Sequence, residues 1–255
     1  MSGAELSFDL PGGGHALFTT RAYGNLSSVG GVDAEHGPQA RERLRRQIGV
    51  ERLQRGYQVH GTAVQRVRLG TRKSERDGRM ELEAGADTEL APVLPPDSTA
   101  QPDVEADGQA TDLHGLGALV LTADCLPVAL SASGAVAMVH AGWRGLAAGV
   151  LEEGVRALRE LGGEGDLVAV IGPGAGPCCY EVGEEVHAAF GGAHRVASPP
   201  ARNIDLKAIA RDRLLTAGAS EVRDVAACTI CDERFFSHRR EGARAGRQGG
   251  VAWLS

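Results

Sequence analysis

Residues 116–140, LGALVLTADCLPVALSASGAVAMVH, decide the fold of this chain, because they hold three apolar runs joined by very short connections. The runs are Leu116–Thr122, Leu126–Ala132 and Ala135–His140. Each run has the length of a β-strand and is too short for a typical buried helix. Their nearly continuous apolar character is typical of strands covered on both faces. The stretch therefore predicts three buried strands.

Hydrophobic spacing predicts further elements on both sides of this core. The expected strands are 15–20, two within 57–69 with His60 at the break between them, 167–171, 221–228 and 251–254. The expected helices are 37–49, 145–161, 181–190 and 203–217. Strands outnumber helices and do not alternate strictly with them. We therefore expect an α+β fold with mixed sheets rather than a doubly wound sheet.

Residues 70–108 differ from the rest, because they are charged, rich in Gly and Pro and lack a periodic apolar face. They predict a flexible polar insertion, either a solvated surface loop or a lid, since the segment leaves directly from the His60 strand. A chain of 255 residues can bury one large core. We expect a single domain spanning residues 1–255 that carries this insertion.

Composition restricts the class of protein and its compartment. The net charge of −6 argues against a general nucleic-acid binder, which needs a basic surface, but local arginines could still hold a small anion. The first ten residues, MSGAELSFDL, lack the features of a signal peptide, and no apolar run reaches membrane-spanning length. Five cysteines are a poor disulfide framework. We expect a cytoplasmic protein with no membrane association, whose thiols are free or bind metal, as a monomer or homodimer.

Three side chains stand out because each ends a predicted strand at a turn: His60 in QVHG, Cys125 in TADC and His140 in HAGWRG. Two imidazoles and a thiolate suit zinc and leave its fourth position open, as in catalytic sites. Their separations in sequence match no short metal motif. A buried or surface histidine, and a small apolar cysteine, therefore stay open as alternatives.

Neighbouring residues add candidate functions. Asp124 could orient a ligand or accept a proton, or it could only cap the turn. Arg144, at the start of the expected helix, could bind an anion or form a surface ion pair. Trp143 could stack on a planar base or simply pack.

The C-terminal stretch 228–250 combines arginines with glycines, which allow close approach of a ligand. It predicts either a phosphate- or ribose-binding loop or a solvated basic tail. The arginines are Arg239, Arg240, Arg244 and Arg247. Cys228 and Cys231 form a single C-x-x-C, which is a weak signal for zinc or redox chemistry. The pair Cys178-Cys179 has no explanation at this level.

Together, several motifs resemble the laccase-domain family. They are QVHG (58–61), TADCLPV (122–128), HAGWRG (140–145), IGP (171–173) followed by CCYEVG (178–183), and CT (228–229) followed by FFSHRR (235–240). Members of that family have been described as multicopper polyphenol oxidases, purine nucleoside phosphorylases and peptidoglycan editing factors. The resemblance implies a layered α/β/β/α fold with two packed mixed β-sheets and outer helices.

The resemblance also implies a function. In the family, the positions matching His60, Cys125 and His140 bind zinc. The implied activity is phosphorolysis of adenosine, inosine and methylthioadenosine, with adenosine deamination, so the expected partners are purine nucleosides and phosphate. Candidate phosphate ligands are Arg21, Arg239 and Arg240, and Asp124 and Arg144 are candidate catalytic residues. This chain departs from the family pattern in two places, which bears on the expected substrate contacts and on access to the site. FTTR is followed by AYGNLSS (22–28), and the insertion at 70–108 is longer than is usual in the family.

Three alternatives stay open. Copper could replace zinc in a polyphenol oxidase, although eight histidines without an H-x-H pair make a poor multi-copper cluster. Cys125 could be the nucleophile of an amide hydrolase linked to peptidoglycan editing, with His140 or His60 as its base. The chain could also be a metal-binding regulatory module without turnover.

Overall fold

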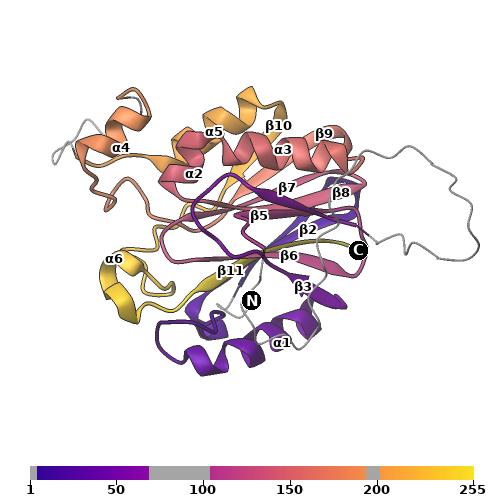
Figure 1. Cartoon of the computed structure of the whole chain (residues 1–255), viewed down its shortest axis with the longest axis horizontal. Coiled ribbons are helices and arrows are strands. Elements are labelled where there is room, and N and C mark those ends of the chain that lie inside the picture. The colour runs from indigo at the N-terminus through magenta and orange to yellow at the C-terminus, as the bar shows by residue number, and fades with distance from the viewer. Residues whose placement is uncertain (1–4, 69–103, 193, 195–201) are drawn as a thin grey trace, which may run out of the picture.

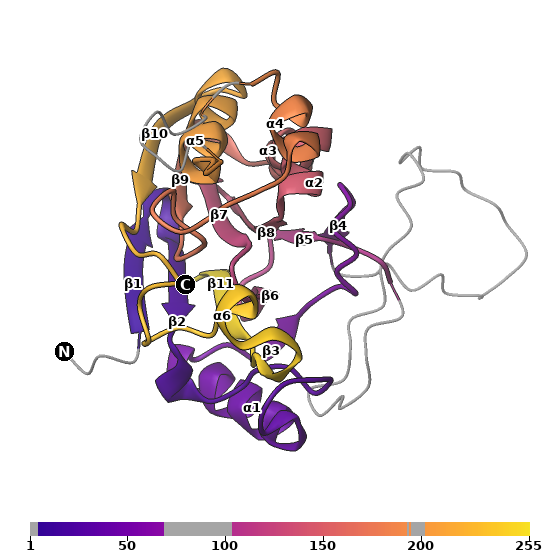
Figure 2. The ribbon, with the colours of Figure 1, turned by 90° about the vertical axis from the view of Figure 1, so that its left-hand side faces the viewer.

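Two β-sheets pack face to face in the computed structural model, which describes residues 5–68, 104–192, 194 and 202–255. Helices cover the outer face of each sheet, so that Figures 1 and 2 show four layers in the order α/β/β/α. Both sheets are mixed. This arrangement confirms the α+β fold class and the two packed mixed sheets expected from the sequence.

The first sheet has five strands in the order β1-β2-β11-β6-β3. Their bounds are β1 Glu5–Leu10, β2 Gly14–Thr19, β3 Arg52–Gln54, β6 Leu116–Thr122 and β11 Gln248–Leu254. Strand β3 is parallel to β6, and the other pairs are antiparallel. The C-terminal strand thus lies in the middle of this sheet, between β2 and β6.

The second sheet has six strands in the order β10-β9-β7-β8-β5-β4. Their bounds are β4 Val64–Val67, β5 Gly108–Thr111, β7 Leu126–Ser133, β8 Ala135–Ala141, β9 Glu164–Ile171 and β10 Ala219–Asp224. The pairs at its two edges are parallel, and the inner pairs are antiparallel. The chain crosses between the sheets in short segments from β3 to β4, from β5 to β6 and from β6 to β7.

Helix α1 lies on the first sheet, and α3 and α5 lie on the second (Figure 1). The α-helices are α1 Gly37–Ile48, α2 Trp143–Ala148, α3 Val150–Glu160, α4 Glu184–Ala189, α5 Leu206–Thr216 and α6 His238–Glu241. Short 3₁₀ turns occur at Pro11–Gly13, Arg21–Tyr23, Ala34–His36 and Gly242–Arg244. Among these described helices, none is long and apolar enough to cross a membrane.

The core has three apolar layers, and strand β8 contributes to two of them. Ala137 and Val139 face helix α3, whereas Val136 and Met138 face the first sheet, as the alternation of a strand requires. All four are fully buried. His140 shares the face of Val136 and Met138, so the alternation directs its side chain into the space between the sheets.

The strands expected within residues 116–140 are confirmed as β6, β7 and β8. The single helix expected over 145–161 is wrong, because the chain breaks there into α2 and α3. Gly149 has a φ of 100°, a left-handed conformation that ends α2, while the apolar spacing continues across the break. Periodicity alone does not reveal such a kink.

Two other expectations near His60 need correction. Of the two strands expected in 57–69, only β4 forms, and Tyr57 makes a single bridge to Glu105. The insertion expected at 70–108 falls mostly outside the described residues, but its C-terminal end is structured. Asp107 is fully buried and Gly108 begins β5. The polar character of this end reflects a buried hydrogen-bonded carboxylate rather than solvent exposure.

Candidate active site

His60, Cys125 and His140 converge where the two sheets end, as the sequence predicted. One ligand atom from each lies within 4.8 Å of the others. Cys125 Sγ is 3.8 Å from His60 Nε2, and the two imidazole rings meet edge to face with centroids 4.9 Å apart. His140 is buried, Cys125 is half-buried and His60 is exposed. The group therefore has one side within the protein and one side open.

These three side chains fit a zinc ion. Zinc–nitrogen and zinc–sulfur bonds of about 2.0 and 2.3 Å in tetrahedral geometry place the two ligand atoms about 3.5 Å apart. The observed 3.8 Å between Cys125 and His60 is close to that edge length. Three protein ligands also leave one position for a reactant, which is the arrangement of catalytic zinc sites.

Local backbone structure brings the three residues together. His60 lies in the segment that crosses from β3 to β4, Cys125 lies in the one that crosses from β6 to β7, and His140 lies near the end of β8. Gly142 follows immediately, and a Cβ atom there would meet the His60 ring at 2.7 Å and Cys125 Sγ at 3.1 Å. A Cβ on Gly145 would meet the Gly61 carbonyl oxygen at 2.7 Å. Both glycines of HAGWRG are thus required for the close approach of α2 to His60.

Asp107 holds two of the three residues in place. Its Oδ1 accepts hydrogen bonds from His140 Nδ1 at 2.7 Å and from the His60 N–H at 3.0 Å. Its Oδ2 accepts from the N–H groups of Gly61 at 2.7 Å and Val59 at 3.2 Å. With its Nδ1 bonded to Asp107, His140 presents Nε2 to the site, which is the usual carboxylate–histidine arrangement behind a metal.

The charges of this group favour an ionised thiol. Burial alone would raise the pKa of Cys125, but the charges and hydrogen bonds of His140 and His60 lower it to about 6. Burial would lower the pKa of His140, whereas Cys125 and Asp107 raise it to about 9. The pKa of Asp107, which burial would raise, is lowered chiefly by His140. A thiolate is thus the stable form of Cys125 at neutral pH, as metal binding requires.

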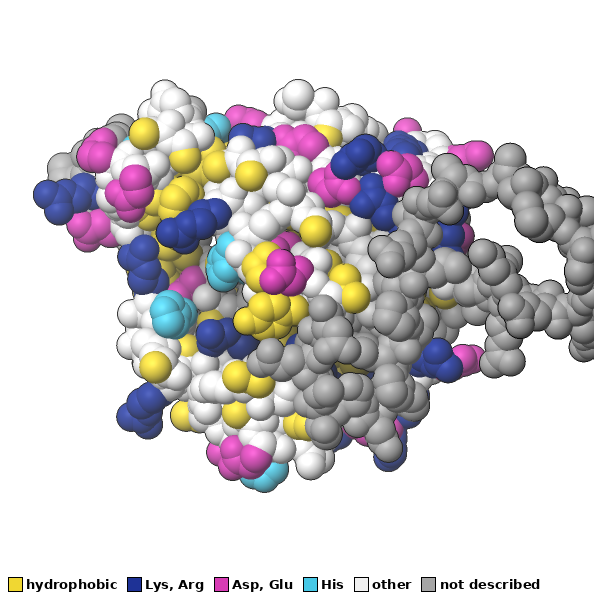
Figure 3. All heavy atoms as spheres, in the orientation of Figure 1, with side chains coloured by type: hydrophobic (Ala, Val, Ile, Leu, Met, Phe, Trp, Pro, Cys, Tyr) yellow, Lys and Arg dark blue, Asp and Glu magenta, His cyan; other side chains and the backbone are white. Residues whose placement is uncertain are grey.

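The three residues lie in a hollow of about 570 Å³, a size typical of small-molecule sites. Four arginines and one aspartate are among its lining residues, which gives it a positive charge in an acidic protein. The charged residues are Arg55, Arg144, Arg239, Arg247 and Asp124. Tyr180 and Trp143 supply aromatic surface. Figure 3 shows histidine and Lys/Arg side chains gathered around this hollow, between the α4 and α6 ends of the molecule.

Two arginines of the hollow are held by aromatic rings. The Arg144 guanidinium lies 4.3 Å from the centroid of the Trp143 ring, and that of Arg239 lies 4.8 Å from that of Tyr180. Arg239 Nη1 also donates to the Glu181 carbonyl at 2.7 Å. These contacts fix both guanidinium groups at the opening of the hollow.

The Asp124 carboxylate joins the hollow to the C-terminal region. Its Oδ1 accepts a hydrogen bond from Thr229 Oγ1 at 2.7 Å, and its Oδ2 accepts one from the Arg239 N–H at 2.7 Å. Asp124 is 6% exposed and has a φ of 86°, an unusual conformation for a residue other than glycine. The two hydrogen bonds of its carboxylate stabilise this strained backbone conformation next to Cys125.

Arg21 and Arg240 lie apart from this hollow. Both bind the carboxylate of Glu241, and Arg240 also donates to the carbonyls of Thr229 and Ile230 at 2.8 Å. They line a second hollow with Val32, Glu233, Glu241 and Arg244. The structure therefore separates Arg239 from these two other arginines that were predicted with it.

Several residues of the site were not predicted from the sequence: Arg55, Asp107 and Tyr180, together with the position of Arg247 in the hollow. A ligand histidine needs a carboxylate partner, but Asp107 stands before strand β5 in a polar stretch typical of exposed loops, so no local signal marked it as that partner. Tyr180 lies in CCYEVG, which was used only as a motif. No sequence feature marked Arg55 as a site residue. Its position depends on how strand β3 connects to the segment that leads to β4.

The chain is similar to known proteins along nearly its whole length. The model of the multi-copper polyphenol oxidoreductase laccase family matches residues 15–255. A purine nucleoside phosphorylase of Xylella fastidiosa is 38% identical over 96% of this chain and 89% of its own length. The purine nucleoside phosphorylase YfiH of Escherichia coli is 38% identical over 58% of this chain and 64% of its own length.

Solved structures show the same fold. A Neisseria meningitidis protein superposes with a TM-score of 0.74 at 29% identity, covering 99% of both chains. YlmD of Geobacillus stearothermophilus superposes with a TM-score of 0.75 at 28% identity, covering 100% of this chain and 97% of that one. From the residues matched and the likeness along nearly its whole length, the chain belongs to the multi-copper polyphenol oxidoreductase laccase family.

Proposed function

We propose that this protein is a zinc-dependent purine nucleoside phosphorylase that cleaves adenosine, inosine and methylthioadenosine and also deaminates adenosine. One observation carries the proposal: a His-Cys-His group with an open side lies in a hollow lined by four arginines and by the rings of Tyr57, Trp143 and Tyr180. The names of the related proteins support the phosphorolysis of purine nucleosides.

The hollow offers a separate partner for each part of the substrates. Trp143 and Tyr180 provide flat apolar surfaces for a purine base. Arg144, Arg239, Arg247 and Arg55 provide charge-assisted hydrogen bonds for phosphate. In phosphorolysis a phosphate oxygen bonds to C1′ of the ribose while the purine leaves. The arginines would hold that oxygen beside the sugar and so reduce the entropy cost of the reaction.

Asp124 is better suited to positioning than to proton transfer. Both of its oxygens accept hydrogen bonds at 2.7 Å, and one of them comes from the backbone of Arg239. We therefore assign it the task of fixing Arg239 and the turn before Cys125. Phosphate binding by Arg21 and Arg240 remains a prediction, which this hollow does not support because Glu241 already binds both.

When bound to His60, Cys125 and His140, zinc would supply a Lewis acid and would bring the pKa of a coordinated water to about 7. Asp107 would keep His140 in the required tautomer. Copper could use the same donors. A multi-copper cluster is disfavoured, because within residues 5–68, 104–192, 194 and 202–255 no group able to hold an ion contains more than two imidazoles.

The direct test is a nucleoside panel incubated with the purified protein, with and without phosphate. We expect free base and ribose 1-phosphate only when phosphate is present, and inosine from adenosine in both cases. Oxidation of a phenol with uptake of oxygen, and no release of base, would support a copper oxidase instead.

Replacing Arg239 by methionine is expected to raise the KM for phosphate by about 10- to 100-fold, the range for loss of a charged hydrogen bond. The KM for the nucleoside should change much less, because methionine keeps apolar contact with Tyr180. Steady-state kinetics with phosphate varied at saturating nucleoside measure this effect. Arg223→Met is the matched control, since Arg223 pairs with Glu221 on β10, away from the hollow. An unchanged KM for phosphate in Arg239→Met would remove Arg239 from phosphate binding.

A second candidate function has its own support. Cys125, His140 and Asp107 are arranged as a nucleophile, a base and an orienting carboxylate, with the pKa of Cys125 lowered to about 6. An amide hydrolase would use this set. A hydrolase mechanism with these three residues has no role for His60, although His60 also contacts Cys125 Sγ. The second imidazole therefore favours a metal.

Alkylation of Cys125 separates these two functions. A zinc-bound thiolate is expected to resist iodoacetamide until a chelator removes the metal, and then to react quickly, because the thiol is ionised at neutral pH. Mass spectrometry of the peptide that contains Cys125 measures the reaction, and a chelated sample reloaded with zinc is the control. Fast alkylation of the untreated metal-loaded protein would favour the hydrolase.

A further inference from the structure

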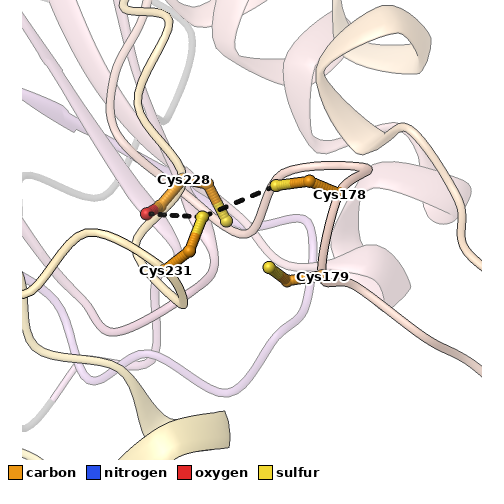
Figure 4. A group of neighbouring side chains, drawn as sticks. All are labelled: Cys178, Cys179, Cys228 and Cys231. Carbon is orange, nitrogen blue, oxygen red and sulfur yellow. Dashed lines mark hydrogen bonds between the residues drawn. The ribbon is translucent and has the colours of Figure 1, made fainter.

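Four cysteines form a second group outside the hollow described above. Cys178 and Cys179 lie in the loop after β9, and Cys228 and Cys231 lie in the loop between β10 and α6. Their four sulfur atoms lie within 4.8 Å of one another. Figure 4 shows the side chains of the two loops facing each other across a small space. None of the four lines the hollow that contains His140.

The spacing of these sulfurs is that of a tetrahedral metal site. Four sulfurs bound to one zinc at about 2.3 Å lie about 3.8 Å apart. Cys178 Sγ and Cys231 Sγ are 3.6 Å apart. A disulfide requires about 2.05 Å, and all four cysteines are free. The set contains only sulfur donors and supplies all four positions, as in structural zinc sites.

The backbone around the sulfurs is shaped for such a site. The Gly176 N–H donates to Cys228 Sγ at 3.2 Å, which favours the thiolate form. A Cβ atom on Gly176 would lie 3.3 Å from that sulfur and 3.4 Å from Cys178 Sγ. Glycine therefore leaves the space next to both sulfurs open. The Thr229 N–H also donates to the Gly174 carbonyl at 3.0 Å, which brings the two loops side by side.

We propose that Cys178, Cys179, Cys228 and Cys231 bind one structural zinc ion that joins the loop after β9 to the loop before α6. Its function would be to hold one wall of the hollow. Tyr180 directly follows Cys179, and Thr229, next to Cys228, donates to Asp124, which in turn holds Arg239. The proposal is independent of the reaction that the first site performs.

Metal content per chain is the main measurement. Protein purified without chelator is expected to contain two zinc ions per chain, one at each site. The double variant Cys228→Ser/Cys231→Ser should contain one, and His60→Ala/His140→Ala should retain the other. Circular dichroism checks that each variant is folded. One zinc in the wild type, lost only from His60→Ala/His140→Ala, would overturn the proposal, and so would iron at the four-cysteine site.

Two measurements on the wild type keep the proposal testable if the serine variants fail to fold. With cobalt in place of zinc, most of the sulfur-to-cobalt absorption is expected from this site, because it holds four of the five cysteines. Thiol titration after unfolding with chelator and without reductant should find all five. Three thiols would mean that a disulfide has formed in place of the metal site, and would contradict the proposal.

Discussion

Replacing His140 by alanine is expected to reduce the phosphorolysis of adenosine by more than about 100-fold, since even the partners behind metal ligands contribute 10- to 100-fold. His140 is the buried member of the three, and the geometry leaves its Nε2 for the ion. The variant also leaves Asp107 buried without its strongest partner. Release of adenine from adenosine plus phosphate measures the activity, and elemental analysis measures the metal.

The matched control is His114→Ala, because His114 is exposed and lies at the other end of strand β6 from Cys125. It should retain both the activity and the metal. If His140→Ala kept full activity, the metal group would have no part in the reaction. If it lost activity with its metal content unchanged, His140 would act on the substrate rather than on an ion. The same analysis distinguishes zinc from copper.

Replacing Asp107 by asparagine is expected to weaken metal binding and to lower activity by about 10- to 100-fold. The carboxylate accepts four hydrogen bonds, two at each oxygen. An asparagine amide keeps one oxygen and replaces the other by an NH₂ group. In either orientation that NH₂ faces two hydrogen-bond donors, so either the His140 and His60 contacts or those of Gly61 and Val59 are lost.

A competition titration against a chromophoric chelator gives the metal affinity of this variant, and assays with excess zinc give its kcat. The control is Asp112→Asn, because Asp112 makes one long ion pair of 4.0 Å with Arg68. A role in folding alone would lower the melting temperature and leave the metal affinity of the folded protein unchanged. That result would contradict our assignment of Asp107 as a positioning residue for the metal ligands.

The positions of most elements could be predicted from the sequence. Leu116–Thr122 forms β6 as expected, and the helix expected over 37–49 is present as Gly37–Ile48, followed by a left-handed Gly49. Such elements depend on the spacing of apolar side chains along one short segment and on the residues that end it. The helix expected over 145–161 was wrong at Gly149, because its apolar spacing continues across a backbone kink.

The three candidate metal ligands could also be selected from the sequence, because His60, Cys125 and His140 are soft donors at the ends of predicted segments. Asp107 could not, since it stands in a polar stretch that is typical of exposed loops. Similarly, the sequence shows that Arg21, Arg239 and Arg240 are charged, but it does not show that Arg239 lies in a different hollow from the other two. Glu241 draws Arg21 and Arg240 to a different hollow.

The sequence by itself determined the α+β class, the buried strands and the identity of the donor atoms, because these depend on residue type and on neighbours along the chain. Only the tertiary structure decided which donors meet. Cys178 and Cys231 are 53 residues apart, and His60 and Cys125 are 65 apart. The parallel pairing of β9 with β10 brings the first pair together, and the crossings from β3 to β4 and from β6 to β7 bring the second pair together. Such long-range packing is determined by the whole core and leaves no local pattern in the sequence.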